Sequence, residues 1–294
     1  MIRALLVIGM LTAVPAWAQS VDNPMQPSAN WDDLRSSIIG TDDEPPIDPA
    51  IFDLDAPKRA DNPALVPVHI TQPAGAPAIA ALTLVIDNNP APVAAEFTFG
   101  KALMPLDFEV RVRVDAYADI RAIATLEDGR KVMAGRFVKA SGGCAAPAGK
   151  SMDEVRSTMG QMRFRSAPDM VPDLAAKDGD AQADGALAQS DVKTAQVPAA
   201  DAADDATQAR EIGTLMIRHP NFSGLQRDQV TLLTIPAEFI QTLEVKQDGQ
   251  LLFGMDAGIS IAEDPVFRFA YQPSAGPIQV HAQDTDNRVW DQSF

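Results

Sequence analysis

The sequence predicts an all-β protein in which two β-sandwich domains are joined by a disordered linker. Apolar and polar residues alternate with a period of two from about residue 65 to 139 and again from residue 213 to the C-terminus, which is typical of half-buried strands. Two Asp-Gly pairs, Asp128-Gly129 and Asp248-Gly249, lie between such runs and favour tight antiparallel hairpins. Between them, residues 173–210 are rich in alanine and aspartate and contain no aromatic residue. Such a segment buries too little apolar surface to offset the entropy of ordering, so we expect a disordered tether.

Residues 1–18 have the features of an export signal. Arg3 supplies a positive charge, an apolar run follows from Ala4 to Val14, and Ala16-Trp17-Ala18 fits a cleavage site. The apolar run is shorter than the roughly 20 residues of a membrane span. We therefore expect an exported, periplasmic protein that is cleaved near Ala18.

A polar extension, residues 19–50, precedes the first sandwich and contains one short helix. Trp31 to Ile39 follow Asn30, a residue type that caps helix N-termini, and Gly40 suits the C-terminal end. We expect Trp31, Leu34 and Ile38 to share the buried face of this helix.

The first sandwich is predicted to span residues 51–143. Its clearest strand is Phe108 to Asp115, where apolar residues at even positions alternate with charged residues at odd positions. Asp128-Gly129 forms the strongest hairpin signal. The expected strands are 65–71, 79–87, 94–99, 108–115, 120–126 and 131–138. Several short strands at this spacing indicate an antiparallel sandwich.

The second sandwich is predicted to span residues 211–294. Its expected strands are 239–246, 251–255, 267–271, 278–283 and 288–292. Asp248-Gly249 lies in one hairpin turn, and Asp284 to Asn287 forms a polar turn between the last two strands. Between the sandwiches, residues 144–172 hold an arm and a short helix that begins with a capping box, Ser151 to Glu154.

Cys144 is the only cysteine of the chain and lies in Gly142-Gly143-Cys144-Ala145-Ala146. Small residues flank it, whereas a core cysteine normally sits in an apolar run. We therefore expect an exposed thiol on a mobile segment. In an exported protein a lone cysteine is a reactive thiol or a site of intermolecular linkage. The alternative is an inert thiol in a glycine-rich turn.

The motifs around these elements resemble those of a known family. The first half contains Val66-Pro67-Val68, Asp87-Asn88-Asn89-Pro90-Ala91-Pro92, Arg111-Val112-Arg113, Asp128-Gly129 and Gly142-Gly143-Cys144. The second half contains His219-Pro220-Asn221-Phe222-Ser223-Gly224, Ile235-Pro236-Ala237-Glu238-Phe239-Ile240 and Ile259-Ser260-Ile261-Ala262-Glu263-Asp264-Pro265. The first half resembles SoxY, the second resembles SoxZ, and the single chain is most similar to the quinoprotein dehydrogenase-associated SoxYZ-like carriers.

The resemblance implies two immunoglobulin-like sandwiches that pair with each other and a non-enzymatic carrier of sulfur intermediates, such as those of thiosulfate oxidation. It implies that Cys144 attaches the cargo covalently and that Gly142 and Gly143 are the hinges of a swinging arm. Its partners would be periplasmic enzymes of sulfur oxidation, or a quinoprotein dehydrogenase or cytochrome c. Here Ala145, Ala146 and Pro147 replace the glycines that follow the family's cysteine, and the arm continues into another domain. The alternative function is a non-covalent accessory protein that docks on the dehydrogenase or its cytochrome.

The remaining candidate residues have simpler interpretations. His219 is one of three histidines and has no Cys-His spacing around it, so we expect no metal site and no cofactor. The arginines of the 108–115 strand are expected to form a solvated face, or alternatively to guide an anionic cargo. The formal net charge of −16 disfavours binding to nucleic acids and anionic membranes.

Overall fold

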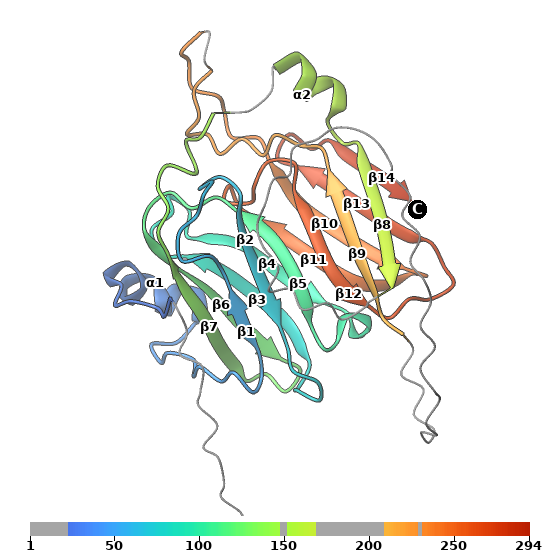
Figure 1. Ribbon diagram of the computed structural model, residues 1–294. Helices are drawn as coiled ribbons and strands as arrows, with labels where there is room; N and C mark the ends of the chain where they lie inside the picture. The colour runs from blue at the N-terminus through green and yellow to red at the C-terminus, as the bar shows by residue number, and fades with distance from the viewer. Residues whose placement is uncertain (1–22, 148–151, 169–208, 229–230) are drawn as a thin grey trace, which may run out of the picture.

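The computed structural model describes residues 23–147, 152–168, 209–228 and 231–294 (Figure 1). The predicted export signal and Ser151 of the predicted capping box lie outside these residues, as does all of the predicted linker except residues 209 and 210. Within the described part of the chain, no helix is both long enough and apolar enough to cross a membrane.

Two antiparallel sheets form the molecule, which confirms the predicted all-β class. The order in the six-stranded sheet is β1 (Asp53–Asp55), β2 (Val66–Thr71), β5 (Asp107–Val112), β12 (Val266–Tyr271), β9 (Glu211–Ile217) and β8 (Met162–Pro168). The order in the eight-stranded sheet is β14 (Val289–Ser293), β13 (Ile278–Asp284), β10 (Ile240–Gln247), β11 (Gln250–Ala257), β4 (Val93–Phe99), β3 (Ile79–Ile86), β6 (Ala118–Leu126) and β7 (Lys131–Val138).

The two halves of the chain join edge to edge within both sheets. In one sheet β5 pairs with β12, with Val110 opposite Phe267. In the other, β4 pairs with β11, with Phe99 opposite Phe253. The sequence predicted a disordered tether between two sandwiches and left open how the sandwiches pack against each other. In the structure, strand pairing across the middle of both sheets joins the two halves (Figure 1).

A single apolar core lies between the sheets and is shared by the two halves. Phe108 of the first half packs edge-on against Phe253 of the second, with ring centroids 5.2 Å apart. Such edge-to-face pairs add to the stabilisation that comes from burying the rings. The shared core explains why the halves form one two-layer body.

The short elements differ in part from the sequence prediction. Helix α1 (Ala29–Ile39) begins two residues earlier than expected, because the side chain of Ser28, not that of Asn30, caps it by accepting from the Trp31 N–H. The helix buries Trp31 and Ile39. The prediction missed strands β1, β8 and β9. Strand β8 is an edge strand with mostly exposed residues, so few of its side chains reach the core. The remaining elements are the 3₁₀ turn η1 (Lys101–Leu103) and helix α2 (Met152–Thr158).

Candidate functional site

The cysteine arm, defined here as residues 139–147, follows β7 and runs along the end of the first half. The Lys139 N–H donates to the Lys58 carbonyl at 3.0 Å. Further along, the Gly142 N–H donates to the Asp115 carbonyl at 2.7 Å, and the Gly143 N–H donates to Val114 at 3.1 Å. The arm is therefore bonded to the loop that follows β5.

The Cys144 side chain is completely buried, with 0% of its surface exposed. The expectation of an exposed thiol on a mobile segment was wrong for this conformation. The glycines explain the difference: a Cβ on Gly143 would lie 2.1 Å from the Pro63 carbonyl oxygen and 2.6 Å from that of Val114. At this position the missing side chain allows backbones to pack closely. Gly142 has a positive φ of 77° and open space around it.

Two side chains of the second half hold the arm in place. The Ser223 hydroxyl donates a short hydrogen bond to the carbonyl oxygen of Cys144. Gln226 Nε2 donates to the Ala146 carbonyl at 2.8 Å. Both side chains are buried, and the Gln226 side-chain oxygen accepts from the Ser223 N–H at 3.1 Å. The second half of the chain thus closes over the cysteine of the first half.

Asp115 and Asn89 fix the other side of the arm. The Cys144 N–H donates to Asp115 Oδ1 at 3.2 Å. The Asp115 N–H in turn donates to Asn89 Oδ1 at 2.8 Å, and Asn89 Nδ2 donates to Ser260 Oγ at 2.8 Å. Since Ser260 belongs to the second half, this network connects the arm to both halves.

Arg113 lies beneath the arm and is 1% exposed. Strand β5 ends at Val112, so Arg113 leaves the alternating pattern and turns inward, whereas Arg111 stays exposed. The expected solvated face is therefore wrong for Arg113. Its Nη1 donates to the Gly143 carbonyl at 3.3 Å, and its Nη2 donates to the Pro220 and Asn221 carbonyls at 3.5 and 3.4 Å. Nε has no hydrogen-bond partner among the described residues. Burial lowers the pKa of Arg113, and the negative charges of Glu263 and an ionised Cys144 oppose that shift.

Burial also controls the chemistry of the thiol. Removal from water raises the pKa of Cys144 to about 12, the Asp115 carboxylate adds to the rise, and the Arg113 guanidinium opposes it. A free cysteine has a pKa of about 8.5. The buried thiol is therefore neutral at neutral pH, and it is unreactive in this state because the thiolate is the nucleophile.

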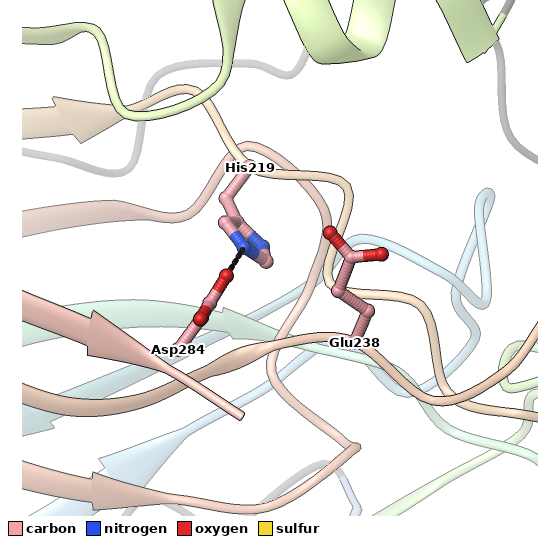
Figure 2. A group of neighbouring side chains, drawn as sticks. All are labelled: His219, Glu238 and Asp284. Carbon is pink, nitrogen blue, oxygen red and sulfur yellow. Dashed lines mark hydrogen bonds and ion pairs between the residues drawn. The ribbon is translucent and has the colours of Figure 1, made fainter. Parts of the chain in front are cut away.

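His219, Glu238 and Asp284 come together from distant parts of the second half (Figure 2). Their candidate ligand atoms lie within 4.8 Å of one another, and His219 Nε2 is 3.5 Å from Asp284 Oδ2. Sequence spacing missed this group because its members are far apart in the chain. Arg288 Nε donates to Asp284 Oδ2 at 2.7 Å, and Arg288 Nη2 donates a short bond to Glu238. A guanidinium thus already compensates the carboxylates where a metal ion would bind.

This charged group supports the loop that holds the arm. His219 begins the segment that contains Ser223 and Gln226, and its Nδ1 lies 2.7 Å from Asn221 Oδ1. Burial lowers the pKa of His219, which favours the neutral ring. Asp284 also accepts from the Arg288 N–H at 2.8 Å in the turn between β13 and β14, which confirms the hairpin interpretation of that turn.

Comparison with known proteins agrees with the two halves seen in the structure. Residues 36–144 match the family described as sulfur oxidation protein SoxY, and residues 196–294 match sulphur oxidation protein SoxZ. The solved structure of the sulfur carrier protein SoxY from Chlorobium limicola f thiosulfatophilum is 22% identical, covers 38% of this chain and 92% of its own, and superposes with a TM-score of 0.32. No curated protein matches the chain.

The SoxY match ends at Cys144, the residue over which the SoxZ-matching half closes. Together the two matches cover more than two thirds of the sequence and both halves of the sandwich. The chain is a fusion of a SoxY-like domain with a SoxZ-like domain.

Proposed function

We propose that this protein is an exported covalent carrier that attaches sulfur-containing intermediates to Cys144 and delivers them to partner enzymes. The observation that carries the proposal is the position of Cys144. The chain's only cysteine ends the SoxY match, at a contact that both domains build around it. A carrier needs an attachment atom and access to it. The partners supply the activation, so the protein itself is not an enzyme.

Attachment follows thiol–disulfide exchange chemistry. The Cys144 thiolate attacks a sulfur atom of the donor, a new S–S bond forms, and the old S–S bond breaks with departure of the leaving group. With tetrathionate the leaving group is thiosulfate and no further oxidant is required. With sulfide or thiosulfate as the donor, attachment removes two electrons, which a partner such as a cytochrome c must accept.

Because the thiol is buried, the carrier alternates between two states. In the docked state the arm lies as in the structure, and in the open state it has left this position and exposes Cys144. The second domain restrains the arm through two side-chain hydrogen bonds, each with a net contribution of roughly 0.5–1.5 kcal/mol. Local opening at such a cost is within the range of sub-global motions of folded proteins. In the docked state the neutral, enclosed thiol is protected from unwanted reaction; in the open state its pKa returns towards about 8.5.

Incubation with tetrathionate followed by intact-mass measurement tests the proposal. The expected result is one thiosulfate-derived adduct, which maps to Cys144 and is removed by reductant. Absence of any Cys144 adduct, with the thiol free after denaturation, contradicts a carrier role. The periplasmic location is tested by fractionation of the native host.

The burial of Cys144 favours a second candidate, a non-covalent accessory protein that docks on a quinoprotein dehydrogenase or its cytochrome. In that case the cysteine is an inert part of the interface between the domains. A Cys144→Ser variant separates the two functions when it replaces the native protein in its host. Loss of sulfur-dependent or dehydrogenase-dependent growth identifies the carrier, and retention of growth identifies the accessory protein.

A further inference from the structure

A short hairpin projects from the second domain beside the cysteine arm. We call it the leucine hairpin and define it by residues 222–228 and 231–238. Phe222 and Glu238 pair through two backbone hydrogen bonds of 2.7 and 3.0 Å. The ladder continues outward through the bridge between Arg227 and Thr234. In Figure 1 this segment is orange and rises beyond the ends of the sheets.

The outer part of the leucine hairpin exposes large apolar side chains. Leu232 and Leu233 are each 69% exposed, and Leu225 is 44% exposed. Among the described residues no large apolar side chain is more exposed than the first two. A group of apolar side chains held in water on one projecting element is typical of an interaction surface.

The backbone at Leu232 supports the same interpretation. Its φ of 60° lies in the left-handed region, which is unfavourable for a residue with a Cβ. The local structure is held by the Asp228 carbonyl, which accepts from the Leu232 N–H at 2.9 Å. The chain thus holds an exposed leucine in an unfavourable backbone conformation. Such local strain is a feature of functional segments.

The inner part of the leucine hairpin holds the cysteine arm. Ser223 bonds the carbonyl of Cys144, and Gln226 bonds that of Ala146. Gln226 is also part of the ladder, since its carbonyl accepts from the Ile235 N–H at 2.9 Å. One small element therefore joins the exposed leucines to the groups that restrain the arm.

We propose that Leu225, Leu232 and Leu233 form the docking surface for the enzyme that loads or processes the group on Cys144. This inference rests on the proposed carrier function. A partner that binds the outer end of the leucine hairpin lies next to the arm. It also contacts the same hairpin whose side chains restrain the arm. Docking and release of the arm are thereby coupled.

The chemistry of the surface defines the partner. Three leucines require an apolar recess, which lies beside the entrance of the partner's active site because the arm must reach that site from the same place. The carrier has a formal net charge of −16, so a basic rim around the recess is favoured, because opposite charge speeds encounter.

The test compares a Leu232→Ser/Leu233→Ser variant with the wild-type protein and with an Ile47→Ser control. Ile47 is 58% exposed and lies outside the leucine hairpin. Each protein is expressed in the native host in place of the wild type and purified without reductant, and the fraction that carries a mass increment on Cys144 is measured. Each is also loaded in vitro with tetrathionate, which needs no partner.

We expect the fraction of protein loaded in the host to be at least tenfold lower for the leucine variant than for the wild type. The control should be loaded like the wild type, and all three proteins should react equally with tetrathionate. An unchanged host load in the leucine variant overturns the docking surface and leaves the carrier function intact. An equal loss of host-derived load in the Ile47→Ser control also overturns the docking surface. If the wild type acquires no load in the host or with tetrathionate, the carrier function itself fails, and this inference fails with it.

Self-association is the competing use of the same surface. Light scattering of the wild type and the leucine variant distinguishes it. A monomeric wild type supports an enzyme as the occupant. A wild-type dimer that the leucine substitutions convert to a monomer contradicts the proposal, because the hairpin would then bind a second copy of the chain.

Discussion

Removal of the two side chains that hold the cysteine arm is expected to make Cys144 reactive. In a Ser223→Ala/Gln226→Ala variant the arm loses its side-chain hydrogen bonds from the second domain. At roughly 0.5–1.5 kcal/mol each, these bonds favour the docked arm by about 1–3 kcal/mol. Since 1.4 kcal/mol is a factor of ten, the open population and the alkylation rate should rise about 5- to 150-fold.

The assay is the rate of iodoacetamide alkylation of the native protein, followed by intact mass. Gln247→Ala is the matched control, because Gln247 is also buried and its Nε2 also donates to backbone carbonyls, those of Ser274 and Gly276 at 3.0 and 3.1 Å, far from the arm in sequence. The control should leave the rate near that of the wild type. A variant rate equal to the wild-type rate, or an equal increase in the control, refutes the idea that these contacts keep the thiol closed.

Two further predictions concern the cysteine arm, and a third concerns the ion pairs of Arg288. Gly143→Ala places a Cβ 2.1 Å from the Pro63 carbonyl oxygen and should release the arm, raising the alkylation rate of Cys144 more than the double substitution does; a stable variant with wild-type reactivity contradicts this. Docking of the arm should be fully stable below about pH 8.5 and weaken as pH rises towards 12, because burial raises the thiol pKa to about 12. The pH profile of wild-type alkylation should therefore reach its plateau well above pH 8.5; a plateau at 8.5 means that the thiol is already free. Arg288→Met should lower the free energy of unfolding by about 2 kcal/mol, less than the 3–5 kcal/mol of a fully buried pair because Arg288 is 40% exposed. Urea unfolding measures that loss, and stabilisation of the wild-type protein by zinc would show instead that the site prefers a metal.

Most strands were predictable because their signals are local, although β1, β8 and β9 were missed. The alternation from Phe108 to Val112 and the Asp128-Gly129 turn each depend on a few neighbouring residues, and both appear in the structure as expected. The edge strand β8 has no such signal, since its side chains are mostly exposed. The joining of the halves through β5 with β12 and through β4 with β11 is a long-range pairing that periodicity does not encode.

The sequence singled out Cys144 as the candidate attachment residue but did not predict that its thiol is buried. The glycines before Cys144 were interpreted as hinges, but sequence does not distinguish a glycine that must move from one that must pack closely. Gly143 packs so closely against the carbonyl groups of Pro63 and Val114 that a Cβ has no room there. Arg113 likewise turns inward because β5 ends at Val112, before the predicted end of this strand at Asp115. The closure by Ser223 and Gln226 depends on contacts across about 80 residues, which no local pattern reports.

The intact mass of the protein, isolated from its native host without reductant, tests the central claim most directly. The carrier account predicts a population with a reductant-labile, sulfur-containing increment that peptide mapping places on Cys144. A uniform unmodified mass under all growth conditions, together with normal function of a Cys144→Ser variant, would contradict it.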